Sequence, residues 1–327
     1  MNFDLYKKKT IAVFVLSLFL FSFSCKEGKK DIAKEEVIEQ EVSNEPFFKL
    51  SLAQWSLHRE IETGELNPFD FPKVAKELGF DAVEWVDQLY AKEIDSMGFD
   101  AVIERWKEES EKHGVKNVLI MVDRAGDLSH FDAQKRNEAV EKHKKYVDAA
   151  AYLGCHAIRV NTFGSFDSDQ WVEATIDGLK TLSEYAATKN ISVLAENHGW
   201  YSSDPRLLIP VIEKINMANC GTLADFGNWC IKRTKNENWG DCAEEYPDKY
   251  EGFERLMTKA QAVSAKAYEF DDKGNETTLD FEKFIKLISN SGYKGYISVE
   301  YENETLNEKE GILATKALLL RAAKGLN

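Results

Sequence analysis

Short apolar segments alternate with longer amphipathic ones along most of this chain, and this alternation constrains the fold most. Short apolar runs are typical of buried strands, and the longer segments have the residue spacing of helices. Strands are predicted at 49–56, 80–86, 115–122, 155–161, 191–197, 220–225, 262–268 and 295–301. Helices are predicted at 70–78, 99–113, 131–153, 168–189, 205–217, 247–260, 279–290 and 308–324. Crossovers of this length force parallel strands, and eight such strands close a ring, so the sequence predicts an α/β fold, a (β/α)8 TIM barrel.

An open, doubly wound sheet is the alternative to the barrel. That fold would call for a glycine-rich phosphate turn after the first strand. The segment AQWSLHRE at 53–60 contains no glycine, which favours the barrel.

The N-terminal segment does not share the alternating pattern. Three lysines at 7–9 precede an apolar run from Thr10 to Ser24, the layout of an export signal that is too short to span a bilayer comfortably. Cys25 follows directly and is similar to the lipidated cysteine of bacterial lipoproteins. We therefore expect a periplasmic or outer-membrane lipoprotein anchored at Cys25. Cleavage after Ser24 that releases a soluble periplasmic or secreted protein is the alternative.

These features divide the chain into three parts. We expect a signal peptide over 1–24, a charged flexible tether over 25–46 and a single barrel domain over 47–327. The only expected membrane contact is through the lipid anchor.

Charge and cysteine content exclude two classes of function. The chain has 56 Asp and Glu against 42 Lys and Arg, a net charge of −14, so nucleic acid is not an expected partner. Its five cysteines include no C-x-x-C pair, which fits neither a disulfide-dense scaffold nor a zinc module. Cys230 and Cys242 share the long loop expected after the sixth strand, and we expect them to be able to pair in an oxidising compartment.

Polar residues gather where the predicted strands end. They are Glu84, Asn161, Glu196, His198, Asp225, Asn228 and Glu300. In a TIM barrel these ends meet at one face, where the active site lies. Burying Glu196, Asp225 and Glu300 there without a cation would be costly, and a divalent metal with oxygen ligands would remove the conflict.

Several segments carry a resemblance to a known family. AENHGW (195–200), GTLADFGNW (221–229) and GYKGYISVEYENE (292–304) resemble the xylose isomerase-like TIM-barrel superfamily, the sugar isomerases and epimerases related to D-tagatose 3-epimerase. The resemblance implies a divalent metal, usually manganese, magnesium or cobalt, held by Glu196, Asp225, Glu300 and a histidine on strand seven. In this chain strand seven has no histidine, and Lys266 and Tyr268 are its candidates for the fourth position.

The resemblance also implies a mechanism. Glu196 and Glu300 are expected to serve as the acid/base pair on either side of an enediolate, and Asn228 stands where relatives often have a substrate-contacting histidine. His198 is expected to polarise the carbonyl or to carry a proton. The predicted function is a metal-dependent sugar isomerase or epimerase, with a 3-keto-glycoside lyase and a non-catalytic sugar-binding barrel as alternatives.

The predicted substrate is an unphosphorylated sugar. The loops after strands seven and eight, at 269–276 and 302–304, are rich in carboxylates that would repel a phosphate. Residues expected to contact the sugar are His58, Glu84, Asn161, Trp200, Asn228, Trp229 and Lys266. The sequence leaves open which sugar is used and whether the protein forms a homo-oligomer.

Overall fold

A computed structural model describes residues 45–326 of the chain. The predicted signal peptide, Cys25 and all but the end of the predicted tether lie outside the described residues. Within 45–326, helices are too short or too polar to cross a membrane.

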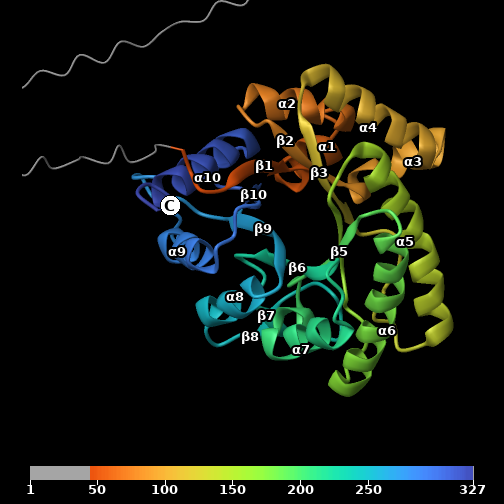
Figure 1. The fold of residues 1–327 in the computed structure, drawn as a ribbon. Helices are drawn as coiled ribbons and strands as arrows, with labels where there is room; N and C mark the ends of the chain where they lie inside the picture. Colours follow the sequence, from red (N-terminus) through yellow and green to blue (C-terminus); the bar gives the residue numbers. More distant parts are fainter. Residues whose placement is uncertain (1–44, 327) are drawn as a thin grey trace, which may run out of the picture. The chain divides into compact units, whose positions relative to one another are not determined.

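The described part of the chain contains a closed barrel of eight strands (Figure 1). Every neighbouring pair in the ring is parallel, and the order is β1-β10-β9-β6-β5-β4-β3-β2. The strands are β1 (Lys49–Ala53), β2 (Ala82–Val86), β3 (Lys116–Val122), β4 (Ala157–Val160), β5 (Ser192–Glu196), β6 (Cys220–Asp225), β9 (Ala260–Ala267) and β10 (Tyr296–Tyr301). The predicted TIM barrel is confirmed, and each of these eight strands overlaps one predicted strand.

Helices surround the ring of strands, as Figure 1 shows. The helices that follow the strands are α2 (Phe71–Glu77), α4 (Phe99–His113), α5 (Ala133–Leu153), α6 (Ser168–Ala187), α7 (Pro205–Ile215), α8 (Lys249–Met257), α9 (Phe281–Ser291) and α10 (Glu308–Ala322). The short helices α1 (His58–Glu62) and α3 (Ala91–Met97) were not predicted. Four 3-10 turns complete the described elements: η1 (Gln54–Leu57), η2 (Pro68–Asp70), η3 (Asp87–Tyr90) and η4 (Trp200–Ser203).

The ends of α5 show why these helices could be located from sequence. The Asp132 side chain accepts hydrogen bonds from the backbone N–H groups of Gln134 and Lys135, which satisfies two donors of the first turn. At the other end Gly154 has a φ of +76°, a left-handed conformation that glycine adopts without strain. Both boundaries are therefore encoded by single residues.

Aromatic packing joins the helices to the strands. Trp85 on β2 stacks on Trp106 of α4 with ring centroids 4.6 Å apart, and both side chains are fully buried. After β6, Phe226 stacks on Phe284 of α9 at 4.2 Å and meets Phe253 of α8 edge-on. Burying a ring of this size contributes roughly 1.5–3 kcal/mol, so these contacts fix the helices against the strands.

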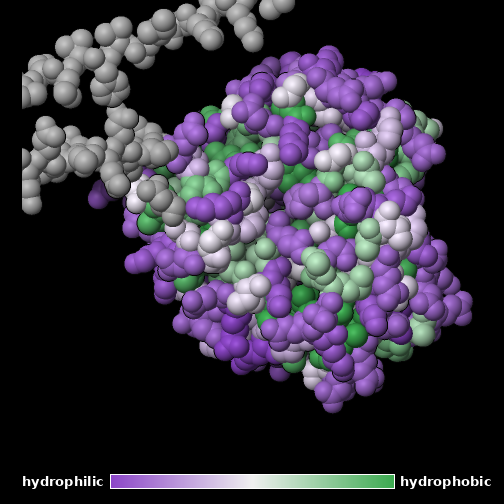
Figure 2. All heavy atoms as spheres, in the orientation of Figure 1, coloured by the Kyte–Doolittle hydropathy of each residue, from purple (hydrophilic) through white to green (hydrophobic). Residues whose placement is uncertain are grey.

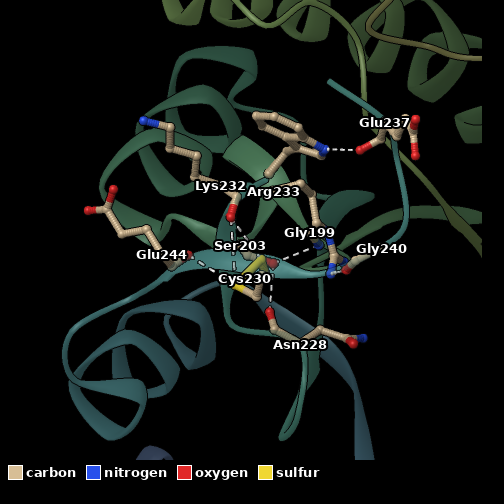
Figure 3. The surroundings of a disulfide bond; sticks show 11 residues. Gly199, Ser203, Asn228, Cys230, Lys232, Arg233, Glu237, Gly240 and Glu244 are labelled. Atoms are coloured by element: carbon tan, nitrogen blue, oxygen red, sulfur yellow. Dashed lines mark hydrogen bonds between the residues drawn. A yellow bond between two sulfur atoms is a disulfide. The ribbon is translucent and has the colours of Figure 1, made fainter. Parts of the chain in front are cut away.

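The segment expected as a long loop after the sixth barrel strand contains a two-stranded antiparallel hairpin. Its strands are β7 (Cys230–Arg233) and β8 (Cys242–Glu245), and a disulfide joins Cys230 to Cys242, which confirms that the two cysteines pair. Figure 3 shows the disulfide beside Gly199 and Ser203, which belong to the segment after β5. The Ser203 hydroxyl donates to the Asn228 carbonyl at 2.6 Å, so the hairpin is joined to that segment.

The face of the molecule seen in Figure 2 is largely hydrophilic, with hydrophobic side chains scattered among charged ones. This pattern agrees with a chain of net charge −14.

Candidate active site

A cavity of about 280 Å³ opens at the carboxyl-terminal ends of the barrel strands. Its walls are formed by Trp55, Gln88, Asp123, Arg159, Glu196, His198, Trp239, Glu300 and Glu302. This is the face on which TIM barrels build their active sites. The volume is at the small end of small-molecule pockets, which suits a ligand the size of a simple sugar.

The alternation of side chains along a strand explains why these residues meet. Residues two apart on a strand point to the same side, so Ser298, Glu300 and Glu302 stack upwards along and beyond β10. Lys266 on β9 lies directly opposite Glu300 in the strand register. The sequence thus places alternating polar residues on the inner face of two neighbouring strands.

Glu196, the last residue of β5, is buried against Arg159 of β4. The Arg159 Nε lies 2.9 Å from Glu196 Oε2, an ion pair whose geometry is not that of a hydrogen bond. The other carboxylate oxygen accepts a hydrogen bond from the Asn228 side-chain amide at 3.1 Å. Burial raises the pKa of Glu196 to about 8 although the Arg159 charge opposes the shift, so this carboxyl can carry a proton at neutral pH.

Glu300 is held by Lys266 in a different way. The Lys266 Nζ lies 3.0 Å from Glu300 Oε1 and 2.8 Å from Glu302 Oε2, and the Ser264 hydroxyl donates to Glu300 Oε2 at 3.0 Å. Burial alone would lower the pKa of Lys266, but the Glu300 and Glu302 carboxylates outweigh it and raise this pKa well above its usual value. Lys266 is therefore a permanent cation in contact with the Glu300 and Glu302 side chains.

Asp225, at the end of β6, is buried beside these two pairs. Its Oδ1 accepts the backbone N–H groups of Gly227 and Asn228 at 2.8 and 2.9 Å, while among the described residues Oδ2 has no hydrogen-bond partner. Burial raises the pKa of Asp225 to about 7, although Lys266 opposes the shift. The neighbouring Asn197 joins β5 to β6 by accepting from the Asp225 backbone N–H at 2.8 Å.

A hydrogen-bond chain fixes the state of His198. Asn161 donates its side-chain amide to Asp123 Oδ1 at 2.7 Å, and its side-chain oxygen lies 2.7 Å from His198 Nδ1. Burial, followed by the positive charges of Arg159 and Lys266, lowers the pKa of His198 to about 3. The neutral ring must therefore donate from Nδ1 to Asn161, which leaves Nε2 as a hydrogen-bond acceptor for a ligand.

The structure brings together most of the residues predicted to act. Glu196, His198 and Glu300 line the cavity, and Asp225 and Lys266 lie buried beside them. Asn161 and Asn228 hold His198 and Glu196, so both act through a neighbour in this arrangement.

Other sequence-based expectations are corrected. Glu84 was expected at the end of its strand, but it lies in the middle of β2 and accepts from the Ser51 hydroxyl at 2.8 Å. Trp200 and Trp229 are only 5% and 3% exposed, so neither ring is free to stack on a sugar. His58 stacks on Trp55 and lies behind it, outside the cavity wall.

Two other tryptophans take the place expected for Trp200 and Trp229. Trp55, just beyond β1, donates its indole N–H to Glu302 Oε1 at 3.0 Å. Trp239, carried by the hairpin, is 54% exposed and meets the His198 ring edge-on with centroids 4.8 Å apart. Trp55 lay inside the strand predicted at 49–56, so strand-end placement missed it, and no sequence signal tells which tryptophan of a long loop turns towards the barrel.

Sequence reasoning also missed Arg159 and Asp123. The two form an ion pair, with Arg159 Nη1 2.5 Å from Asp123 Oδ1. Burial alone would raise the pKa of Asp123, but the Arg159 charge outweighs it and lowers this pKa. A charged residue in the middle of the apolar strand segment CHAIRVN was the available signal for Arg159.

The residues present do not fit the divalent metal that the family resemblance implies. Within residues 45–326, no three His, Cys, Asp or Glu side chains are arranged to hold a metal ion. Glu300 is instead bound by the Lys266 ammonium, and Glu196 faces the Arg159 guanidinium. Of the predicted ligand set, Glu196 and Glu300 are therefore engaged in internal ion pairs. Asp225 is held through Oδ1 by two backbone N–H groups, and its Oδ2 has no hydrogen-bond partner among the described residues.

The fold and the site together define a (β/α)8 barrel with acid/base side chains at the face where such barrels bind their ligands. The family model described as xylose isomerase-like TIM barrel matches residues 72–323, and the chain belongs to this family. No curated protein sequence matches the chain significantly.

Solved structures with the same fold include sugar epimerases. The 3-keto-D-glucoside 4-epimerase of E. coli is 16% identical with a TM-score of 0.63, and the match covers 83% of this chain and 98% of the epimerase. A D-allulose 3-epimerase from Methylomonas sp. is 12% identical with a TM-score of 0.63, over 85% of this chain and 99% of the other. The IolI protein, solved with a zinc atom, is 14% identical with a TM-score of 0.63, over 86% and 99%.

Proposed function

We propose that this protein is an isomerase or epimerase of an unphosphorylated keto-sugar or keto-glycoside. The observation that carries the proposal is the pair of carboxyl groups of Glu196 and Glu300 in one cavity, held by different cations. Lys266 Nζ lies 3.0 Å from Glu300 Oε1, while burial raises the pKa of Glu196 to about 8. A carboxylate base and a carboxylic acid in one cavity are what a proton transfer across a substrate carbon requires. The sugar epimerases among the similar folds support the same reaction class.

The proposed reaction moves one proton at a carbon next to a carbonyl. The Glu300 carboxylate takes the C–H proton, the C–H electron pair becomes the C–C double bond, and the carbonyl oxygen takes up the negative charge. The Glu196 carboxylic acid then returns a proton to the opposite face of that carbon, which inverts it and restores the carbonyl. Alternatively, it protonates the former carbonyl carbon while the hydroxyl proton of the first carbon passes to the former carbonyl oxygen, which isomerises the sugar. The negative oxygen would be stabilised by Arg159, which lines the cavity, and each proton transfer supplies roughly 10²- to 10⁴-fold in rate.

The remaining cavity side chains suit a sugar. His198 Nε2 would accept a hydrogen bond from a hydroxyl, and the Trp55 and Trp239 rings offer apolar faces for a sugar ring. Glu302 and Asp123 add negative charge to the wall, and Arg159 and Lys266 are already paired with carboxylates. A phosphate dianion would meet these carboxylates, so an unphosphorylated substrate fits better.

A divalent metal, expected from the family resemblance as manganese, magnesium or cobalt, is not part of this proposal. The Lys266 ammonium lies against Glu300 and Glu302, where it would repel a metal ion at Glu300. Each step above uses only side chains of this chain.

Export and anchoring are proposed on the sequence alone. We propose that residues 1–24 are removed and that Cys25 is lipidated. Cys25→Ser should move the protein from the membrane fraction to the soluble fraction of cells that express the full chain, and an unchanged distribution would contradict the anchor.

Proton exchange at carbon tests the proposed activity directly. The protein is incubated in D₂O with free ketoses and with 3-keto-glycosides, and loss of the C–H signal is followed by NMR. Glu196→Gln and Glu300→Gln should each slow the exchange by about 100-fold or more, because each loses its proton transfer. Glu108→Gln, on the exposed face of α4, is the matched control and should have no effect.

The outcomes separate the alternatives. Exchange with formation of an epimer or isomer supports the proposal, and release of the aglycone from a keto-glycoside indicates a lyase instead. Binding without exchange would make the barrel a sugar-binding protein. Full activity in either glutamine variant at Glu196 or Glu300 would place the acid/base groups elsewhere.

A further inference from the structure

Lys266 occupies a central position in the barrel. It lies on β9, between β6 and β10, and its side chain is nearly inaccessible at 2% exposure. A buried ammonium is costly unless carboxylates compensate it, so its surroundings must be built around its charge.

Three carboxyl groups surround this ammonium. Lys266 Nζ contacts Glu300 Oε1 and Glu302 Oε2 at 3.0 and 2.8 Å, and Asp225 is close enough to favour its charged form. Both Glu300 oxygens are engaged, because the second accepts from Ser264. A metal ion at Glu300 would therefore lie next to the Lys266 ammonium, which would repel it.

Arg159 provides a second buried positive charge. It lies between Glu196 and Asp123 and is 4% exposed. Lys266 and Arg159 together carry two positive charges, the charge of one divalent ion, and they are distributed over the carboxylates that a metal would otherwise draw together.

We propose that Lys266 replaces a divalent metal in this barrel, as a built-in cation that neutralises Glu300, Glu302 and Asp225 and assembles the site without a metal ion. Lys266 is a positioning residue in this arrangement, since it lies behind Glu300 and Glu302, which line the cavity. Its charge lies 3.0 Å from Glu300 Oε1 and lowers the cost of negative charge in the cavity. Only this effect on a substrate rests on the proposed function.

Metal titration of the folded protein tests the inference without any substrate. The wild-type mature protein is dialysed against EDTA, its metal content is measured by elemental analysis, and its melting temperature is followed as Mn²⁺ is added. We expect less than about 0.1 ion per chain and no saturable rise in melting temperature, because the carboxylates are already neutralised. One tightly held ion per chain, or a saturable rise on adding Mn²⁺, would overturn the proposal.

Variants of Lys266 test whether removal of its charge allows a metal ion to bind. Lys266→Gln removes the charge, so it should melt at a lower temperature than wild type and should gain a saturable stabilisation by Mn²⁺. Lys266→Arg keeps the charge and should not respond to Mn²⁺. Lys189→Gln removes a surface lysine that pairs with Asp148 at 2.8 Å, and it is the control for loss of an ion pair.

A second neutral variant keeps the test decisive. If Lys266→Gln does not fold, Lys266→His, refolded with and without Mn²⁺, should recover structure only with the ion and hold one ion per chain. The replacement of a metal by Lys266 would be refuted if the neutral variants were not stabilised by Mn²⁺. It would also be refuted if the Lys266→Arg protein were stabilised by Mn²⁺. These readouts need no turnover, so they stand or fall separately from the epimerase assay. If the metal replacement and the epimerase activity are both correct, EDTA should change the rate of C–H exchange by wild type by less than about twofold.

Discussion

Loss of the Cys230–Cys242 disulfide should destabilise the protein by an amount that its loop length sets. The bond closes a loop with a sequence separation of 12 residues. The chain-entropy relation for cross-links gives about 3 kcal/mol for a loop of this length at 25 °C. For a domain of this size, that free energy corresponds to a fall in melting temperature of roughly 5 °C.

The hairpin should also respond locally. Figure 3 shows it beside the segment of Gly199 and Ser203, and the same hairpin carries Trp239 to the cavity. Without the disulfide, β7 and β8 are joined only by a short irregular ladder, so the hairpin should open more often than the barrel unfolds. Hydrogen exchange should therefore quicken in 230–245 before it does in the barrel strands, and KM for a sugar should rise.

The assay compares the double variant Cys230→Ser/Cys242→Ser with wild type, each with and without dithiothreitol. Reductant should lower the melting temperature of wild type to that of the variant and should leave the variant unchanged. Cys155 and Cys220 are buried free thiols in both proteins, so they do not account for a difference. Melting temperatures that agree within about 1 °C in all four samples, together with unchanged exchange in 230–245, would refute the loop-entropy reasoning.

Two further predictions concern pH and Trp239 of the cavity wall. Burial raises the pKa of Glu84 and Asp225 to about 7 and of Glu196 to about 8, so the folded state holds protons that the unfolded chain releases, and stability should fall as pH rises. Two buried histidines have lowered pKa values, and below about pH 6.5 they make stability rise with pH instead. The fall in stability should therefore appear between about pH 6.5 and 8, measured as the midpoint of urea unfolding. A flat midpoint over this range would contradict the prediction. In steady-state assays, Trp239→Ala should raise KM by roughly 10-fold with little change in kcat, because stacking on a sugar contributes about 1–2 kcal/mol. Phe131→Ala removes another exposed aromatic side chain and should leave KM unchanged.

The barrel could be predicted because its signals are local. Predicted helix 99–113 matches α4 at both ends, since Gly114 adopts a left-handed conformation at its end. The hairpin of β7 and β8 could not be found in the same way. Both strands are short and largely polar, and β8 is exposed along its whole length. They therefore lack the alternation of apolar and polar residues that marks a half-buried strand.

The site was predictable only in part. Strand-end placement located Glu196 and Glu300, because the barrel brings all strand ends to one face. It failed for Glu84, because β2 continues to Val86 and the carboxyl therefore lies in the middle of the strand. It could not show that Arg159 faces Glu196, since that pairing depends on which strands are neighbours and which way each side chain points.

The ring closes between its first and last strands. Trp55 and Glu302, which share a hydrogen bond at the cavity wall, are 247 residues apart in the chain. Such distant parallel pairings form slowly, because the intervening chain must first be ordered. During synthesis the barrel therefore stays open, and its cavity incomplete, until nearly the whole chain has emerged. Truncation after β9 would remove Glu300 and Glu302 together with the strand that pairs with β1, so folding and formation of the site are completed by the same late step.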